Sequence, residues 1–478
     1  MAIEALVLLT IGIPVLGTLL IAPLARISYK ARNSVAALLA IATAIVSLMM
    51  IPFGLSGGEA TLHKDIGLGL DFVLVVDAFS IFMAVVSSFL GALITLFSLD
   101  YVKETEHQTE YYSMVLLFIG SMMGLVFSVN LIFLYLFWEI AGICSWRLIG
   151  FYRVREFVTI ANKSFLITFG GAVLMLVGFF QIFQATGTFD LTLMRGFVIP
   201  SSAVLLILIG MFSKSASLPF HTWLPDAGIA PSTVTALLHA AVLVKIGVYA
   251  FGRIFVYSLG VPPVWQVLIP WLAILSSLVG AAAALVEYDI KRILAYSTIS
   301  QIGYIFLGFA VLDPSGISGA TFYILTHGLA KAGLFLCAGI IEHSAHKRDI
   351  RQLGGLGKKM PLTSAAFLVC ALSVIGIPPF GGFFAKFLVI AGTVKAGFTS
   401  AAAFALFIAI LTLLYLFRLF HAVFLGAEKE PAPKPEGSTL MVSVVVVLAI
   451  LSLASGIFAS YPMALVETAT VEMTRCLP

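Results

Sequence analysis

The sequence predicts an all-α polytopic membrane protein of about fourteen transmembrane helices, and three observations support this fold class. The first is composition: 61% of the 478 residues are hydrophobic and 10% are charged, whereas a soluble domain carries about 25% charged residues. The second is that apolar runs such as "SSAVLLILIGMF" are continuous, which favours helices over the alternating strands of a barrel. The third is that basic residues follow the connections between these runs.

The apolar runs give the positions of the helices in chain order. A helix needs about 20 mainly apolar residues to cross a bilayer. The first run, "MAIEALVLLTIGIPVLGTLLIAP", lacks the basic start of a cleaved signal peptide, so we predict that it is the first membrane helix. The predicted helices span 2–25, 33–53, 72–99, 111–127, 130–152, 162–185, 201–218, 231–256, 265–286, 292–311, 317–341, 361–393, 399–425 and 438–460.

The basic residues predict how the chain is oriented. With fourteen crossings both termini lie on one side, and the connections alternate between the two sides. One set of connections holds most of the lysines and arginines. The other set, together with the termini and the end of helix eight, holds only Lys64, Arg195, Arg253, Lys395 and Arg475. The positive-inside rule places the rich set in the cytoplasm and both termini outside. We expect the inner membrane of a prokaryotic cell.

The helices fall into four segments. Residues 1–110 hold helices one to three, 111–256 hold helices four to eight, 257–425 hold helices nine to thirteen, and 426–478 hold a Pro-rich linker and helix fourteen. The two middle segments contain five helices each. A unit with an odd number of crossings is inverted when it is repeated in tandem, so we predict two inverted five-helix repeats. The polar connections are too short to form a soluble domain.

Four lysines and one glutamate lie deep inside predicted helices: Glu139, Lys214, Lys245, Lys331 and Lys386. An ionised side chain at the bilayer centre costs at least about 2.5–3.5 kcal/mol, so each needs a partner or water. A structural salt bridge is one explanation for any single pair. One acid cannot neutralise four bases permanently, however, and a desolvated lysine loses its proton more easily. The stoichiometry favours proton transfer.

Two histidines extend this set. His327 and Lys331 are four residues apart and share one face of their helix, so we predict that His327 belongs to the same relay. His239 and Lys245 are six apart and point to different faces of their helix. For His239 a relay role and a packing role both remain open.

Two of the predicted helices are interrupted beside a lysine. Helix seven meets Pro219 five residues after Lys214, and helix twelve contains "SVIGIPPFGGFFAKF", in which Pro378 and Pro379 precede Lys386. Proline inside a membrane helix frees backbone carbonyls that water, polar groups or ions must satisfy. Broken helices at corresponding places in two repeats are typical of transporters with an ion site at the breaks. A packing kink is the alternative.

The sequence gives no sign of a cofactor or metal in this chain. Cys144, Cys337, Cys370 and Cys476 are scattered, with no CxxC pair and no histidine at ligand spacing. Neither a dinucleotide fingerprint nor a phosphate-binding GxxxxGK[ST] loop occurs. The basic residues form no nucleic-acid patch. A redox enzyme acting alone is therefore disfavoured, and whether the chain serves an enzyme stays open.

Six motifs carry a resemblance to a known superfamily: "FWEIAGICSWRLIGFY", "KSASLPFHTWLPDA", "APSTVTALLHAAVLVKIGVYAFGR", "EYDIKRILAYSTISQIGY", "HGLAKAGLFLCAG" and "GIPPFGGFFAKF". In order and spacing they resemble the antiporter-like proton-pumping membrane subunits of respiratory complex I. They are equally similar to the related subunits of Mrp-type cation/proton antiporters and membrane-bound hydrogenases. The resemblance covers predicted helices three to thirteen.

The resemblance implies a role for each deep group. Glu139 would set the proton affinity of Lys214. The line through the middle of the membrane would consist of Lys245, His327 and Lys331, and Lys386 would hand protons outward. Arg147 does not map onto the pattern of the superfamily, and we expect it to be a snorkelling anchor at the cytoplasmic end of its helix.

The resemblance also implies partners and a function. The chain would translocate protons, with Na⁺ as an alternative coupled ion, as a transport subunit of a respiratory or energy-converting complex. Its partners would be other antiporter-like and small membrane subunits, peripheral redox subunits and the lipid bilayer. One alternative is a subunit of an Mrp-type Na⁺/H⁺ antiporter without redox coupling. A scaffold that transports nothing is the third possibility, which the number of deep ionisable residues disfavours.

Overall fold

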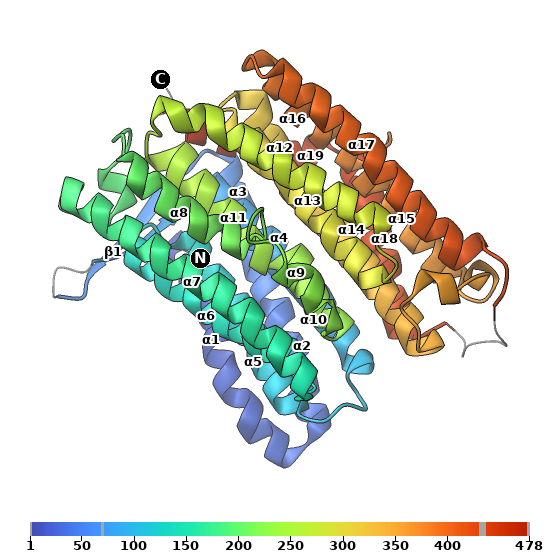
Figure 1. Ribbon diagram of the computed structural model, residues 1–478. Helices are drawn as coiled ribbons and strands as arrows, with labels where there is room; N and C mark the ends of the chain where they lie inside the picture. Colours follow the sequence, from blue (N-terminus) through green and yellow to red (C-terminus); the bar gives the residue numbers. More distant parts are fainter. Residues whose placement is uncertain (1, 68–70, 430–435, 476–478) are drawn as a thin grey trace.

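The computed structural model describes residues 2–67, 71–429 and 436–475, which form one helical bundle with a short β-hairpin at one end (Figure 1). In the first half of the chain the elements are α1 (Ile3–Ile27), α2 (Tyr29–Leu48), α3 (Ile51–Leu55), β1 (Ala60–Asp65), β2 (Asp71–Val76), α4 (Ala78–Tyr101), α5 (Gln108–Phe127), α6 (Leu131–Ile149), α7 (Arg155–Thr186), η1 (Leu191–Leu193), α8 (Ser201–Lys214), α9 (Trp223–Asp226), η2 (Ala227–Ile229), α10 (Ser232–Ala236), η3 (Leu237–Ala241), α11 (Leu243–Phe251) and η4 (Gly252–Ser258). In the second half they are α12 (Pro263–Val286), α13 (Ile290–Ala310), α14 (Pro314–Ala345), η5 (Ile350–Gln352), η6 (Leu356–Lys358), α15 (Pro361–Ile375), α16 (Gly381–Lys395), α17 (Thr399–Phe420), η7 (His421–Leu425), α18 (Thr439–Ile457) and α19 (Ser460–Thr474).

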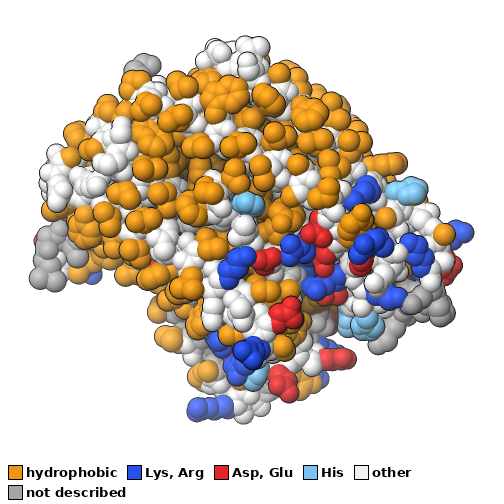
Figure 2. All heavy atoms as spheres, viewed as in Figure 1, with side chains coloured by type: hydrophobic (Ala, Val, Ile, Leu, Met, Phe, Trp, Pro, Cys, Tyr) orange, Lys and Arg blue, Asp and Glu red, His pale blue; other side chains and the backbone are white. Residues whose placement is uncertain are grey.

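The bundle has the dimensions and surface of a multi-pass membrane protein, as predicted. Among the described residues, twelve helices are long and apolar enough to cross a membrane, and α8 and α15 are shorter apolar helices. Figure 2 shows a surface that is largely hydrophobic, with the charged side chains gathered along one edge. The count of fourteen crossings, the four segments and the inverted repeats stay predictions.

The two ends of the bundle differ in their connections. One end, which we call the basic end, carries the connections at 28, 102–107, 150–154 and 346–360. The other, which we call the hairpin end, carries β1 and β2 together with the connections at 187–200, 259–262 and 311–313. Both the first residues of α1 and the last residues of α19 lie at the hairpin end: Glu4 shares a pocket with β1 and β2, and Glu472 contacts the start of α4. Which end faces the cytoplasm stays a prediction.

Aspartates cap several helices where the chain enters the bundle. Asp77 caps α4 in a capping box with Ser80, each side chain bonding the backbone N–H of the other. Asp289 accepts two backbone N–H groups at the start of α13, and Asp313 does the same for α14, which continues with Pro314 in its first turn. These side chains satisfy the free N–H groups of the first turns and so fix where each helix begins.

The prediction of a continuous helix over 72–99 is wrong at its start. Residues 71–76, "DFVLVV", form β2, which pairs antiparallel with β1 so that Leu62 lies opposite Leu74. A run rich in valine suits a pleated strand whose side chains are buried, and the cap at Asp77 begins the helix only after it. The sequence pattern of apolar residues alone could not separate the strand from the helix that follows.

The predicted last helix, 438–460, corresponds to α18 (Thr439–Ile457), and a further helix that the sequence did not predict, α19, follows it. α18 ends at Ile457, and α19 continues the chain to the hairpin end. α19 carries Glu467 and Glu472, so its apolar content falls below that of a crossing helix, and it is not among the crossing helices of the described residues. It packs on α14 and α4. The consequence is a break between two helices that the hydropathy pattern does not show.

The two breaks that the sequence predicts, near Pro219 and at Pro378 and Pro379, are present. α8 ends at Lys214, and the short α9 begins only at Trp223. The predicted helix 361–393 consists of α15 and α16, separated at 376–380. The predicted helix 231–256 is continuous from Ser232 to Ser258, with π-helical turns at η3 and η4. Such turns occur frequently at functional sites.

Two helical segments form the centre of the bundle. The segment Ser232–Ser258 is fully buried, and α14 is buried along nearly all of its length. α13, α15, α16, α18 and α4 pack around α14, and Figure 1 shows the central helices with α1, α5, α6 and α7 on one side and α15–α18 on the other. Any polar group on these central helices is therefore surrounded by protein.

A fully buried ion pair joins α4 to η4 at the hairpin end. Asp77 and Arg253 are both 0% exposed, and the guanidinium donates two hydrogen bonds to the carboxylate, at 2.5 and 2.9 Å. Arg253, which the sequence places at the end of the eighth predicted helix among the few basic residues of that side, is therefore an internal partner of a carboxylate. Breaking such a pair leaves one buried charge uncompensated.

We expect Asp77→Asn to lower the free energy of unfolding by about 3–5 kcal/mol, because Arg253 keeps its charge and loses its counter-ion. The measurement is unfolding of the purified protein in mixed micelles. Glu59→Gln is the control: its pair with Arg195 is about 30% exposed on both sides and should be worth about 0–1 kcal/mol. Equal losses in the two variants would contradict the importance assigned to burial.

Candidate functional site

The first part of the candidate site lies between α6 and α8. Lys214 is the last residue of α8 and is 1% exposed. Glu139 lies in the middle of α6 and is half-buried. A Cβ on Gly142, one turn along α6, would lie 2.9 Å from the Lys214 ammonium and 3.8 Å from the Glu139 carboxylate. The two predicted partners therefore face one small gap that glycine leaves open.

Glu139 and Lys214 face this gap without touching. Among the residues that the structure describes, neither the Lys214 ammonium nor Oε1 of Glu139 has a hydrogen-bond partner. The ammonium lies 5.4 Å from the centre of the Trp138 ring, where the negative face of the ring attracts a cation. The structure thus holds the pair in a separated arrangement.

Lys245 on α11 and His327 on α14 form the closest contact among the predicted residues. Their Nζ and Nδ1 atoms are 2.7 Å apart, and both residues are fully buried. Both side chains are bases. A hydrogen bond between them requires that one donates and the other accepts, and two cations at this distance would repel each other strongly. The contact therefore holds at most one positive charge.

α14 continues the line toward Lys331. Tyr323, His327 and Lys331 follow one another at four-residue spacing, so they lie on one face of the helix, as predicted for the last two. The Tyr323 and His327 rings are 5.8 Å apart. In the described ranges, Nε2 of His327 has no hydrogen-bond partner, so one of its nitrogens remains available beside the contact with Lys245.

His239 lies near this line without joining it by a hydrogen bond. It sits in the π-helical turn η3 and is fully buried, with its ring 4.3 Å from that of Phe335. Neither of its ring nitrogens has a partner in the parts of the chain described. The packing role that the sequence left open accounts for the ring, and the two free nitrogens keep the relay role open as well.

Lys331 donates to groups on the neighbouring helix α13. Its ammonium is 2.6 Å from Ser297 Oγ and 3.0 Å from the Leu294 carbonyl. Ser297 in turn shares a hydrogen bond of 2.7 Å with the Tyr415 hydroxyl on α17. The lysine is therefore bound by neutral oxygens only.

A second set of polar groups leads from Tyr415 toward Lys386. The Gln301 amide donates to the Tyr415 hydroxyl at 3.3 Å, and its carbonyl oxygen accepts from Tyr323 at 2.6 Å. The Lys386 ammonium lies 5.9 Å from the centre of the Tyr323 ring and 4.9 Å from that of Tyr304. Polar side chains on α13, α14 and α17 thus fill the space between the two lysines.

Lys386 binds the backbone at the break between α15 and α16. Its ammonium donates to the Val374 carbonyl at 2.8 Å and to the Ile375 carbonyl at 3.3 Å. Both carbonyls are at the end of α15, before Pro378 and Pro379. This arrangement agrees with the expectation that the break frees carbonyls, and it shows that the lysine itself satisfies them.

The break near Pro219 is arranged differently. Trp223, in the short helix after the break, donates from Nε1 to the Ser213 carbonyl at 2.9 Å. Ser215 donates to the Val244 carbonyl on α11 at 3.0 Å. These contacts occupy two carbonyls that Lys214 could otherwise bind. A tryptophan past such a break is expected in an interfacial belt, but Trp223 is fully buried against α8.

Arg147 has a partner that the sequence did not reveal. Its guanidinium contacts the carboxylate of Glu110 on α5, which also pairs with Arg153 at 2.5 Å. It therefore ties α6 to α5 near the basic end, which adds an ion pair to the anchoring role expected for it.

The structure adds Ser297, Gln301, Tyr304, Tyr323 and Tyr415 to the residues singled out from the sequence. A partial signal was present, because Ser297 and Gln301 are four apart within the apolar stretch "ILAYSTISQIGYIFLGFA" and share a helix face. Tyrosines are ordinary core residues in membrane helices, so nothing in the pattern separated these three from the others. Within the described ranges, no three His, Cys, Asp or Glu side chains gather as metal ligands.

The arrangement defines a class of protein: a polytopic membrane protein with ionisable side chains lined up through its centre. Comparisons with known proteins give the family. Residues 128–412 match the family model described as "NADH:quinone oxidoreductase/Mrp antiporter, TM", and residues 65–112 match that of the N-terminus of complex I chain 5. The chain belongs to this NADH:quinone oxidoreductase/Mrp antiporter family.

Individual relatives come from both branches. The chain is 37% identical to an Na(+)/H(+) antiporter subunit of Alkalihalophilus pseudofirmus, over 78% of this chain and 50% of the relative. It is 36% identical to NADH-quinone oxidoreductase subunit L of Mycobacterium tuberculosis, over 84% of this chain and 66% of the relative. The chain thus spans between half and two thirds of the length of these two relatives.

Solved structures share the whole fold. A chain of the Mrp complex from Dietzia sp. matches with a TM-score of 0.89 and 25% identity, over 99% of this chain and 98% of that one. A chain of an archaeal membrane-bound sulfane sulfur reductase matches equally well, with a TM-score of 0.89 at 23% identity over 98% of both chains, and this second likeness concerns the fold alone.

Ser297→Ala should lower the free energy of unfolding by about 1–3 kcal/mol, because Lys331 and Tyr415 both lose a buried hydrogen-bond partner. Chemical unfolding of the purified protein measures this. Ser88→Ala is a matched control, since Ser88 is fully buried on α4 and bonds carbonyls of its own helix. A loss no larger than that of the control would show that the hydroxyl does not hold the lysine.

Proposed function

We propose that this chain is a proton-translocating subunit of a multi-subunit membrane complex, and that protons cross the middle of the bundle along Lys245, His327, Lys331 and Lys386. The observation that carries the proposal is the contact between Lys245 and His327. Two buried bases at 2.7 Å hold at most one positive charge between them, so a proton on one can move to the other with small rearrangement. A structural salt bridge would instead need an acid at this place.

The polar groups beyond this contact support a continuous route. Lys331 is held by Ser297, which is bonded to Tyr415. Tyr415 and Tyr323 both bond to Gln301, and Tyr323 lies beside Lys386. Hydroxyl groups both donate and accept, so they can support proton transfer between two lysines that do not touch. We place proton uptake from the basic end near α10 and α11, and release at Lys386.

In this proposal, Glu139 and Lys214 control the relay. Their attraction falls by about half when the separation doubles from about 4 to about 8 Å. When the two approach, the carboxylate holds the proton on Lys214; when they separate, Lys214 releases it toward Lys245. The separated arrangement around Gly142 corresponds to the releasing state.

The place of Glu139 supports a neighbouring subunit. Glu139 is half-buried on α6, and a carboxylate whose exposed part faced lipid would be costly. Contact with another membrane subunit would cover it and would let that subunit move the carboxylate. The structural relatives come from multi-subunit membrane complexes, and we propose antiporter-like and small membrane subunits as partners of this chain.

The same relay also suits a second function, that of a subunit of an Mrp-type antiporter, which would exchange protons for Na⁺ without a redox partner. The similarity to the Na(+)/H(+) antiporter of Alkalihalophilus pseudofirmus supports it, and the similarity to NADH-quinone oxidoreductase subunit L supports redox drive. Isolation of the intact assembly in mild detergent separates the two. Peripheral redox subunits in the assembly favour the first function, and membrane subunits alone favour the second.

Lys245→Met should reduce proton flux on the order of 10²-fold, because it removes one of two bases that share the proton. Flux is measured with the assembly reconstituted in vesicles, with an imposed membrane potential and a trapped pH dye. Lys395→Met replaces an exposed lysine at the end of α16 and should leave the flux unchanged. Normal flux in Lys245→Met would remove the basis of the proposed route.

Glu139→Gln should abolish pumping while the assembly stays intact, because a neutral amide no longer attracts the Lys214 ammonium. Proton uptake by vesicles reports the first effect, and co-purification of the partners reports the second. Glu156→Gln changes an exposed residue at the start of α7 and serves as the control. Undiminished uptake by Glu139→Gln vesicles would exclude control of the relay by this pair.

A further inference from the structure

The break beside Lys386 is surrounded by hydroxyl groups that have no protein partner. Thr326 on α14, Ser373 on α15 and Ser452 on α18 are at most 1% exposed, and in the described parts of the chain their hydroxyl oxygens make no hydrogen bond. Buried polar groups of this kind are normally satisfied by a protein group or by water. Thr326 and Ser373 lie against Gly381 and Gly382 of the break, and Ser452 lies one turn before Ser455, which contacts Gly381; we call these three hydroxyl groups the polar vestibule.

The break between α15 and α16 lies directly against the end of α18. A Cβ on Gly381 would lie 2.5 Å from Ser455 Oγ and 2.6 Å from the Thr326 methyl group, and one on Gly456 would lie 2.0 Å from the Pro379 carbonyl. The chain thus brings the α15–α16 break and the α18–α19 break together, where glycines allow the backbones to touch. Irregular backbone at two adjacent breaks supplies polar groups inside the bundle.

α19 continues from this point along α14 to the hairpin end. Ser318 on α14 and Thr470 on α19 share a hydrogen bond of 2.9 Å. Two residues further, Glu472 accepts a hydrogen bond of 3.0 Å from the Ala78 backbone N–H, at the start of α4. The seam between α14 and α18–α19 therefore has polar groups at three places: the vestibule, the contact of Ser318 with Thr470, and Glu472 at the hairpin end.

Among the described residues, Glu472 makes no ion pair with an arginine, unlike the neighbouring carboxylates of Asp77 and Glu59. It is 4% exposed, and within the residues described its Oε1 has no partner. Asp77 binds both terminal nitrogens of Arg253, and Glu59 on the preceding connection pairs with Arg195 at 2.6 Å. Two titratable tyrosines also lie among these groups: the Tyr257 hydroxyl accepts from Arg195 at 2.8 Å, and the Tyr249 hydroxyl accepts from Arg253 Nε at 3.0 Å.

We propose that protons released by Lys386 leave the bundle through the seam between α14 and α18–α19, and that Glu472 is the last protonatable group before the solution at the hairpin end. This proposal rests on the proposed function. The Lys386 ammonium gives its proton, through hydroxyls and water in the vestibule, to the Glu472 carboxylate, which leaves a neutral amine and a neutral carboxyl group. Glu472 then releases the proton to the solution and becomes anionic again.

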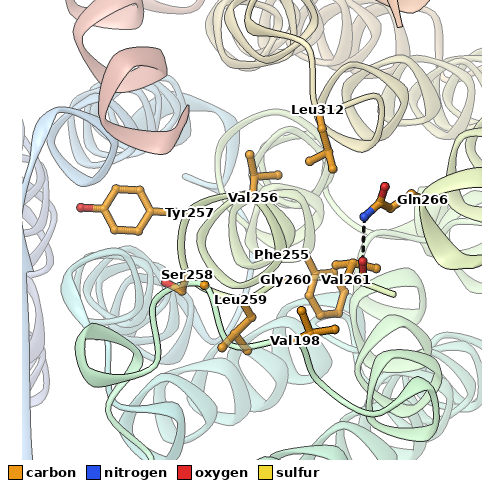
Figure 3. Close-up of a pocket in the computed structure, with 11 residues that line it drawn as sticks. Val198, Phe255, Val256, Tyr257, Ser258, Leu259, Gly260, Val261, Gln266 and Leu312 are labelled. Atoms are coloured by element: carbon orange, nitrogen blue, oxygen red, sulfur yellow. Dashed lines mark hydrogen bonds between the residues drawn. The ribbon is translucent and has the colours of Figure 1, made fainter. Parts of the chain in front are cut away.

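The pocket between η4 and α12 is a less suitable route for protons to the hairpin end. It has a volume of about 210 Å³ and is lined mainly by apolar side chains such as Val198, Phe255 and Leu312. Figure 3 shows that Gln266, its polar side chain on α12, is already bonded to the Val261 carbonyl, and that Tyr257 points away from Val198 and Leu312. The titratable side chain in its lining is that of Tyr257, which already accepts from Arg195, and the rest of the lining offers no acid or base to receive a proton from Lys386.

The protonation behaviour of Glu472 agrees with the proposal. Burial, and then the negative charge of Asp77, raise the pKa of this carboxyl to about 7 from an ordinary value of 4.5. The folded protein therefore binds this proton more tightly than the unfolded chain does. Stability from this group is present below pH 4.5 and is lost as the pH rises toward about 7. A group that titrates there can both take up and release protons at neutral pH.

The test compares Glu472→Gln with Glu467→Gln, which makes the same change at an exposed position of the same helix. Both variants are studied in the reconstituted assembly, with proton flux measured as the pH at the hairpin end is varied. We expect Glu472→Gln to slow release on the order of 10²-fold and to remove the dependence of flux on that pH around neutrality. Glu467→Gln should behave as the wild type.

Two measurements without transport complete the test. Infrared spectra of the purified assembly should show a protonated carboxyl band that titrates near neutral pH in the wild type and in Glu467→Gln, and that is missing in Glu472→Gln. The melting temperature of the wild type should fall relative to Glu472→Gln as the pH rises from 4.5 to 7. An unchanged band, or wild-type flux and pH dependence in Glu472→Gln, would overturn the proposal.

The outcomes also separate this proposal from the proposed function. If the wild-type assembly carries no protons, the proposed function fails and the route fails with it. If the wild type and Glu467→Gln carry protons and Glu472→Gln does so equally well, only the route is wrong. If Ser318→Ala with Thr470→Val slows flux as Glu472→Gln does, while the carboxyl band remains, the seam itself is supported.

Discussion

The structure depends on burying several lysines in the middle of a membrane protein with too few acids to neutralise them. A charged lysine surrounded by protein must be satisfied by hydrogen bonds, aromatic faces or water. The chain meets this requirement in different ways: Lys245 binds a histidine, Lys331 a serine, and Lys386 two backbone carbonyls. In each case the partner is neutral or a base, and the helices must pack so that these partners reach the ammonium groups.

This requirement explains the irregular parts of the fold. The break between α15 and α16 supplies the carbonyls that Lys386 binds, and the gap at Gly142 gives Lys214 and Glu139 room to face each other. A regular helix could not supply these carbonyls, because they would already be bonded, and any residue larger than glycine at position 142 of α6 would close the gap. The fully buried pair of Asp77 and Arg253 shows the contrast, since there an acid and a base match and hold two helices together.

The family relation fits this arrangement and limits what it implies. The chain belongs to a family whose named members include subunits of Na⁺/H⁺ antiporters and of NADH-quinone oxidoreductases. The line of buried bases suits the proposed movement of protons with redox coupling and with cation exchange alike, because in both cases the energy would come from outside this chain. The half-buried Glu139 is the feature through which another subunit could supply it.

The sequence by itself determined the membrane class, the approximate places of the apolar helices, the breaks near Pro219 and Pro379, and the residues of the central line, because hydropathy, helix breakers and deep charges are visible in the order of residues. Only the tertiary structure decided which groups touch. The strand 71–76, the helix 460–474 and the partners Ser297, Gln301 and Tyr415 depend on contacts between segments far apart in the chain. Such contacts leave no period in the sequence, so spacing along one helix could place His327 beside Lys331 but not beside Lys245.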